Sequence, residues 1–175
     1  GNQPIGRGIG PALEARDILQ VLRNDGHAPQ DLREKSLQLA GILLEMGEKA
    51  APGQGYALAQ RTLLDGSAMK KFEAICMAQG GFSEPPVAEF THCIRAPHSG
   101  VVAYFNNRFI ARLASLAGAP NAKAAGIELH VTLGDEVEAG APLFTLHAEA
   151  PGELAYALDF LDGHTDVIRI EEQMV

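Results

Sequence analysis

The sequence has no tryptophan and only two cysteines, and none of its apolar runs approaches the ~20 residues that a membrane-spanning helix needs. We therefore expect no membrane partner. Cys76 and Cys93 could pair, but no secretory signal is visible, so we expect reduced thiols in a cytoplasmic protein. The six histidines lack HxH or HExxH spacing and no CxxC pair occurs, which predicts that the chain holds no metal.

A basic surface is also lacking, because the formal net charge is −8. Nucleic-acid binding requires a surface that neutralises phosphates, so we expect no nucleic-acid partner. Hydrophobic residues make up 46% of the chain and charged residues 21%, which is typical of a globular protein with one domain or two small ones. The chain also lacks an initial methionine, and we expect it to be a fragment of a longer protein.

The first half of the chain has the residue spacing of helices. Asp31 and Glu34 have the spacing of a capping box at the start of the second helix, and Ser67 is a candidate N-cap of the fourth. Apolar residues occur on nearly all sides of the second helix, so we expect it to be buried. Helices are predicted over residues 12–24, 31–46, 53–65 and 67–79.

Pro85 and Pro86 cannot continue a helix, and we expect a domain boundary or a crossover within residues 82–89. Beyond it, short alternating segments indicate strands mixed with helices. The predicted order is ββα–ββ–αβ, with strands over residues 90–95, 101–105, 127–132, 143–146 and 167–170 and helices over residues 107–117 and 154–161.

The strands on both sides of Gly134 and Asp135 have one inward and one outward face, because Ile127, Leu129 and Val131 alternate with polar residues. Their GDxVxxGxPL turn resembles the hairpin of biotinyl- and lipoyl-carrier domains, which carry the cofactor on a lysine. Residues 147–150 contain no lysine, so we expect no carried cofactor.

A glycine-rich run, Gly6-x-Gly8-x-Gly10, precedes the first predicted helix. Free N–H groups at a helix start could receive an anion, and Arg7 would add positive charge. The spacing is neither GxGxxG nor a phosphate loop, and we expect no strand before it. A simple tight turn is therefore the favoured interpretation.

Candidate nucleophiles and bases are few. A Cys–His pair formed by Cys93 with His92 or His98 is disfavoured, because adjacent strand residues point to opposite faces. His130 and His147 could face each other across paired strands, and we interpret them as an ordinary cross-strand pair.

Two clusters of charge have equally ordinary interpretations. Asp135, Glu136 and Glu138 crowd one turn, where three acids normally form a solvated edge rather than an acid–base pair. Lys70 and Lys71 are expected on the solvated side of the fourth helix. The residues alone thus indicate an α+β protein without a visible catalytic site.

Four segments in this order resemble the C-terminal part of the pyrimidine nucleoside phosphorylases. The amino-acid sequence of the first segment is especially similar to the thymidine phosphorylase branch of the family, which also contains archaeal AMP phosphorylases. The segments are residues 2–15 (NQPIGRGIGPALEA), residues 65–81 (DGSA, KF and AQGG), residues 94–100 (IRAPHSG) and residues 125–143 (AGIELH and GDxVxxGxPL).

The resemblance implies an α+β architecture in two parts. Residues 1–82 would be a helical segment at the end of a central α/β nucleoside-binding domain. Residues 88–175 would be the C-terminal α/β-hammerhead domain, which would also explain the likeness to carrier domains.

The resemblance also implies a reaction, cleavage of thymidine by inorganic phosphate to thymine and 2-deoxyribose 1-phosphate, in a cytoplasmic homodimeric parent. The family's phosphate loop and base-gripping residues lie upstream of this chain, so no catalytic residue, cofactor site or metal site is assigned and the chain alone should be inactive. Asn2 and Gln3 could help to wall the base pocket. A parent that prefers nucleoside 5′-monophosphates and a non-catalytic hammerhead binding module remain alternatives.

Overall fold

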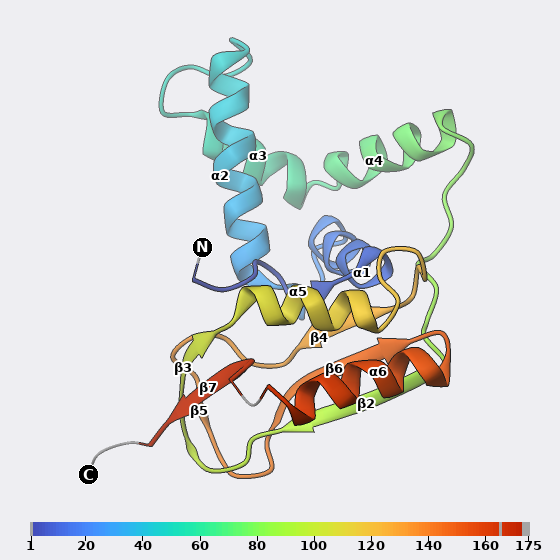
Figure 1. The fold of residues 1–175 in the computed structure, drawn as a ribbon. Coiled ribbons are helices and arrows are strands. Elements are labelled where there is room, and N and C mark those ends of the chain that lie inside the picture. The colour runs from blue at the N-terminus through green and yellow to red at the C-terminus, as the bar shows by residue number, and fades with distance from the viewer. Residues whose placement is uncertain (1, 165, 173–175) are drawn as a thin grey trace. The chain divides into compact units, whose positions relative to one another are not determined.

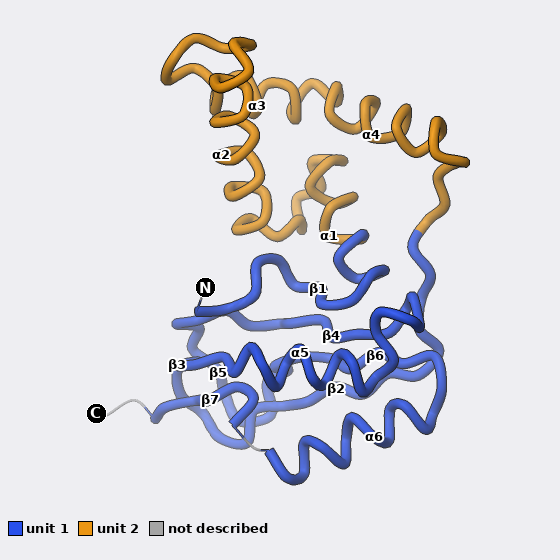
Figure 2. Tube along the Cα trace, turned by 45° about the horizontal axis from the view of Figure 1, so that its top comes forward, with its two compact units in different colours: residues 1–15, 85–175 blue, residues 16–84 orange. Residues whose placement is uncertain are grey.

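The computed structural model describes residues 2–164 and 166–172 (Figure 1). The chain divides into two compact units (Figure 2): unit 1 comprises residues 1–15 and 85–175, and unit 2 comprises residues 16–84. The helices are α1 (Pro11–Leu22), α2 (Gln30–Met46), α3 (Gly55–Leu64), α4 (Ser67–Ala78), α5 (Asn107–Leu116) and α6 (Pro151–Asp162). The strands are β1 (Gly8–Ile9), β2 (Phe90–Arg95), β3 (Gly100–Phe105), β4 (Gly126–Leu129), β5 (Glu136–Val137), β6 (Pro142–Ala148) and β7 (Ile168–Glu171).

Unit 1 contains two antiparallel sheets with α5 and α6 packed against them (Figure 1). The larger sheet has the order β1-β4-β6-β2 and the smaller β5-β3-β7. One continuous core joins the elements, and its largest fully buried side chains are Val102, Phe105, Leu113, Ile127 and Leu146. The expected α+β class is confirmed.

The strand pair β4–β6 lies at the centre of the larger sheet, as the alternating pattern predicts. Ile127 pairs with Leu146 and Leu129 with Phe144, and all four are buried. The amphipathic pattern of α5 is also confirmed, and the Asn106 side chain caps it by accepting the N–H of Phe109. Two short strands, β1 and β5, were not predicted.

Strand β1 lies within the glycine-rich run, which we expected to form a simple tight turn. It pairs with β4, so that Gly8 is opposite Glu128 and Ile9 is opposite Ile127. A Cβ atom on Gly8 would overlap the backbone of Leu13, and one on Gly126 would overlap the Ile9 carbonyl oxygen. Only glycine allows backbones to approach this closely, and Gly126 also has a φ of +150°.

Unit 2 has a much smaller core, formed by Val21, Ala28, Leu37, Ala59 and Leu63. Its closest packing is between α2 and α3. The two backbones lie too close together there for any side chain, and each helix has a glycine at the contact, Gly41 in α2 and Gly55 in α3. A Cβ atom on Gly41 would lie 2.6 Å from the backbone nitrogen of Tyr56. The Gly55 N–H at the start of α3 donates to the Glu45 carboxylate at 2.8 Å.

Three expectations for unit 2 are wrong. Helix α2 is exposed on much of its surface, since an apolar residue is buried only where another element covers it; its buried residues are Leu37 and Gly41. The capping box does not form, because Pro29 is the N-cap of α2 and Glu34 instead accepts a hydrogen bond from Tyr56. Ser67 is not the N-cap of α4, because Gly66 holds that position. The Ser67 N–H instead donates to the Asp65 carboxylate.

The first prediction concerns the contact between β1 and β4. Gly126→Ala should lower the free energy of unfolding by about 1–3 kcal/mol, because the added methyl group forces the two backbones apart. Chemical denaturation followed by circular dichroism measures this. The matched control is Gly152→Ala in α6, where an added Cβ meets no atom within 4 Å and stability should stay equal or rise. Equal effects of both substitutions would contradict the steric explanation.

The second prediction concerns the bond between the Tyr56 hydroxyl and the Glu34 carboxylate, which measures 2.7 Å. This bond lowers the pKa of Glu34 and raises the pKa of Tyr56. Glu34→Gln removes the charge that opposes phenolate formation, so the pKa of Tyr56 should fall toward its ordinary value. Absorbance titration of the phenolates reports the shift, and Glu48→Gln should leave the curve unchanged. An unchanged curve in Glu34→Gln would show that the bond does not form in solution.

Candidate functional site

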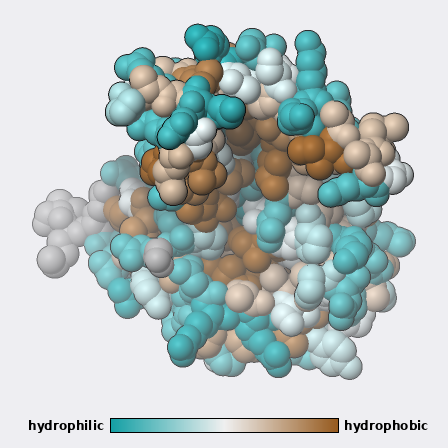
Figure 3. All heavy atoms as spheres, turned by 90° about the horizontal axis from the view of Figure 1, so that it is seen from above, coloured by the Kyte–Doolittle hydropathy of each residue, from teal (hydrophilic) through white to brown (hydrophobic). Residues whose placement is uncertain are grey.

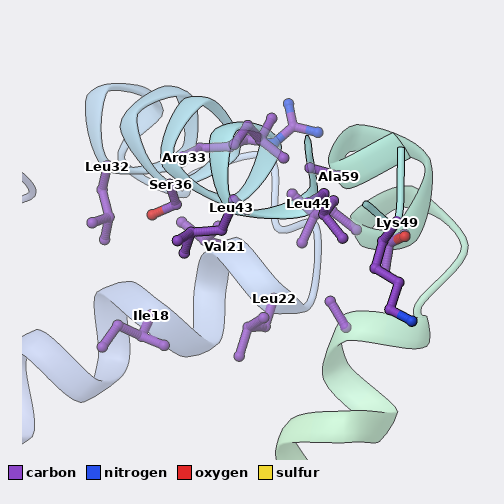
Figure 4. A pocket seen from close by; sticks show the side chains of 15 residues that line it. Ile18, Val21, Leu22, Leu32, Arg33, Ser36, Leu43, Leu44, Lys49 and Ala59 are labelled. Carbon is purple, nitrogen blue, oxygen red and sulfur yellow. The ribbon is translucent and has the colours of Figure 1, made fainter. Parts of the chain in front are cut away.

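An apolar groove lies between the helices of unit 2, and we call it the helical groove (Figure 4). Its volume is about 520 Å³, and apolar side chains of α1 and α2 point into it from facing sides. It lies directly on the small core of unit 2. Its lining consists of Ile18, Val21, Leu22, Leu32, Arg33, Ser36, Leu37, Ala40, Leu43, Leu44, Lys49, Ala59, Thr62, Leu63 and Ala68.

The polar groups of the helical groove are few and unsuited to catalysis. Thr62 donates its hydroxyl to the Leu58 carbonyl of its own helix at 2.9 Å, and Ser36 is the other hydroxyl of the lining. Arg33 and Lys49 add positive charge. The described lining includes no carboxylate, imidazole or thiol, so it offers neither an acid–base pair nor a metal-ligand set. The groove is built to bind apolar surface.

Exposed apolar residues continue from the groove along α2. Leu43 is 66% exposed and Met46 is 76% exposed, and Leu39 and Ile42 are also exposed. Figure 3 shows apolar side chains at the surface among hydrophilic ones. Burying such side chains is worth roughly 1.5–3 kcal/mol each, so their exposure is costly and points to a covering partner.

The glycine-rich run of unit 1 has its backbone groups engaged within the protein. The Gly10 N–H donates to the Glu14 carboxylate at 3.1 Å, and the Arg7 carbonyl accepts the Leu129 N–H at 2.8 Å. An added Cβ atom on Gly10 would overlap the Ala125 carbonyl oxygen. Close backbone approach explains these glycines, and a carboxylate of this chain already takes the place of an anion at Gly10.

Asn2 and Gln3 lie against the loop that follows β4. The Gln3 side-chain oxygen accepts the Leu133 N–H at 2.7 Å. Asn2 lines a surface depression of about 390 Å³ together with Leu133 and residues 103–108 at the start of α5. Their role as walls of a base pocket stays a prediction.

The two histidines expected to face each other do not. His130 bonds to the Thr145 hydroxyl at 2.7 Å, whereas His147 lies opposite Gly126 in the strand register. The expected pairing is off by four residues, because the loop length after β4 could not fix the register from the sequence. Cys93 of β2 lies opposite Thr145 of β6. The Cys93 sulfur lies 3.8 Å from the carbonyl oxygen of Ile94.

Sequence reasoning missed the most unusual side-chain environment of unit 1. His147 is buried, and neither ring nitrogen has a hydrogen-bond partner among the described residues. Its Nε2 lies 3.6 Å from a carboxylate oxygen of Glu128. Strand alternation could have found this pair, since Glu128 and His147 lie on the same face of neighbouring strands.

The acidic turn is organised by Asp135, whose two carboxylate oxygens accept the Thr132 N–H at 2.7 Å and the Thr132 hydroxyl at 2.9 Å. Glu136 and Glu138 line a shallow depression with Glu172. In residues 2–164 and 166–172, no three or more histidine, cysteine or acidic side chains are arranged to hold a metal ion. The described helices likewise include none that is long and apolar enough to cross a membrane.

Part of unit 1 is similar to a known family model. Residues 101–166, which run from β3 to just beyond α6, match the family model described as "Pyrimidine nucleoside phosphorylase C-terminal domain". The match covers the central strand pair and both helices of unit 1. The resemblance carried by the four sequence segments is thereby confirmed.

Individual relatives are similar over nearly the whole chain. A "Putative thymidine phosphorylase" of Hahella chejuensis is 60% identical over 99% of this chain. A protein of the same name from Chelativorans sp. is 56% identical over 98% of it, and "Putative thymidine phosphorylase 2" of Acidovorax sp. is 55% identical over 99%. The matched region is 34% of each relative, so the chain spans about a third of their length.

The third prediction concerns the acidic turn. Asp135→Ala removes the acceptor of both Thr132 bonds and should lower the free energy of unfolding by about 1 kcal/mol. Urea denaturation measures the change. Glu138→Ala, an exposed acid of the same turn, is the control and should shift stability by less than about 0.5 kcal/mol. A larger loss in the control would mean that the charge of the turn, rather than its hydrogen bonds, stabilises it.

Proposed function

We propose that this chain is the C-terminal part of a nucleoside phosphorylase that acts on thymidine. The observation that carries the proposal is the 55–60% identity, over nearly the whole chain, to proteins named putative thymidine phosphorylase. Because the chain spans a third of their length, we assign the activity to the longer protein. Residues 88–175 would form its C-terminal α/β-hammerhead domain and residues 1–82 the end of its central domain.

The proposed reaction is a displacement at the anomeric carbon of the nucleoside. A phosphate oxygen forms a bond to that carbon, the bond to the base nitrogen breaks, and its electron pair leaves with the base, which then takes a proton. Catalysis of this kind depends on positioning the phosphate and stabilising the charge on the departing base. The longer protein would need no cofactor besides phosphate as co-substrate, and would be a cytoplasmic homodimer.

We propose further that the chain alone does not catalyse this reaction. The helical groove supports this, because its described lining is mostly apolar and includes no carboxylate, imidazole or thiol to act as a general acid or base. The glycine-rich run supports it as well, since the Gly10 N–H is bonded to Glu14 and is not offered to phosphate. The part played by this chain would be structural, as a support for residues supplied elsewhere in the longer protein.

The fourth prediction tests the activity directly. This chain and the full-length Hahella chejuensis relative are assayed side by side for release of base from thymidine, uridine, AMP and CMP, with and without phosphate. The relative should release thymine from thymidine only when phosphate is present, and this chain should release nothing.

Each other outcome corrects a different part of the proposal. Release only from the monophosphates would move the substrate to nucleoside 5′-monophosphates. Thymine release by this chain alone would refute its proposed inactivity. Absence of release by the relative from all four substrates would remove the functional proposal and leave the α+β fold unaffected.

A further inference from the structure

Strand β2 forms one edge of the larger sheet of unit 1 (Figure 1). It has six residues and pairs with β6 on one side, whereas β1 at the opposite edge has two residues. Thr91, His92 and Arg95 are exposed. Edge strands are normally protected by a proline, a lysine or a bulge, and the β2 sequence, FTHCIR, contains neither proline nor lysine. This edge is therefore open to pairing with another strand.

The register between β2 and β6 determines which backbone groups of β2 point outward. The Ala96 N–H, directly after β2, donates to the Ala141 carbonyl at 2.8 Å. The extra residue at the register shift lies in β6, so β2 itself is continuous. Because backbone groups alternate in direction along a strand, the even-numbered residues of β2 face β6. The N–H and C=O groups of Thr91, Cys93 and Arg95 consequently point away from the sheet.

A second copy of this chain has the complementary charges for this edge. Two antiparallel copies of β2 must pair odd-numbered residues with odd-numbered residues, because those carry the outward backbone groups. When Thr91 lies opposite Cys93 of the second copy, Glu89 lies opposite Arg95 at both ends of the strand pair. Opposite charges in such cross-strand positions are stabilising. A shift by two residues in either direction would separate both charge pairs, so the charges select one register.

The other side chains of β2 suit the same register. Phe90 lies opposite Ile94 of the second copy, and both are only partly buried in the single chain. His92 lies opposite His92 of the second copy, on the twofold axis that relates the two strands. The Arg95 side chain donates to the Gly140 carbonyl at 3.0 Å, and a guanidinium has further N–H groups for a carboxylate.

We propose that β2 is a self-association edge, at which two copies of this chain pair their β2 strands antiparallel with Glu89 of each copy opposite Arg95 of the other. The contact joins two larger sheets into one. Stable interfaces bury about 800 Å² per partner, more than a single strand pair supplies, so the dimer is weak and reversible. The contact is a property of this chain and is independent of the homodimer and the reaction proposed for the longer protein.

The fifth prediction exchanges the charges at the two ends of the strand. Glu89→Arg or Arg95→Glu alone places like charges opposite each other, and each should raise the dimer Kd at least tenfold. In an equimolar mixture of these two variants, each copy carries one sign at both positions and the other copy carries the opposite sign. The mixture should therefore dimerise as well as the unchanged chain. Sedimentation velocity over a range of protein concentrations measures these constants.

The matched control is Glu73→Arg, which makes the same change of charge at an exposed position of α4 and should leave the Kd unchanged. A second measurement uses His92→Cys in a background with Cys76→Ser and Cys93→Ser. Cα atoms of directly opposite, non-hydrogen-bonded residues lie about 4.5 Å apart, which suits a disulfide. Oxidation should cross-link this variant at least tenfold faster than His98→Cys, an exposed position outside the strand, in the same background.

The other outcomes overturn the proposal. A chain that stays monomeric up to about 1 mM would show that the edge remains solvated. A dimer that tolerates both single charge variants would place the contact elsewhere on the chain. Weakening by the single variants without recovery in the mixture would refute the register. None of these measurements involves turnover, so their failure would leave the proposed reaction unaffected, and absence of phosphorolysis would leave this contact unaffected.

Discussion

The structure of unit 1 depends on the pairing of β4 with β6. This pair places Ile127 beside Leu146 and Leu129 beside Phe144 at the centre of the larger sheet, and β1 and β2 add to its two sides. The same four side chains belong to the core against which α5 and α6 pack. Strand register is strict when one face is buried, because a slip by one residue would turn every one of these side chains toward the opposite face.

Unit 2 shows the opposite situation, although its sequence is also rich in apolar residues. The contact between Gly41 and the start of α3 holds two helices at very short range, and the Glu45 carboxylate fixes the first turn of α3. Beyond this contact the helices find few partners within the unit. Apolar content therefore produces a closed core in one unit and an open groove in the other, and the difference lies in the available partners rather than in composition.

Much of the fold was predictable, since its signals are local. The strands β2 and β6 follow from their short apolar or alternating segments, and the helix α5 follows from its helical spacing. The strand β1 was not predictable, because two residues carry no periodicity and the partner of Gly8 lies far along the chain. The helical groove was missed for a related reason: helical spacing identifies an apolar face but says nothing about whether another element covers it.

The sequence separation of two contacts has a consequence for the order of folding. The bond from Gly55 to Glu45 closes a short loop, so α2 and α3 can associate at little entropic cost as soon as both have formed. The pairing of Gly8 with Glu128 closes a very long loop and requires β4 to be in place. During synthesis the first residues of this chain must therefore wait for a strand made much later, and the glycine-rich run stays unpaired through most of that interval.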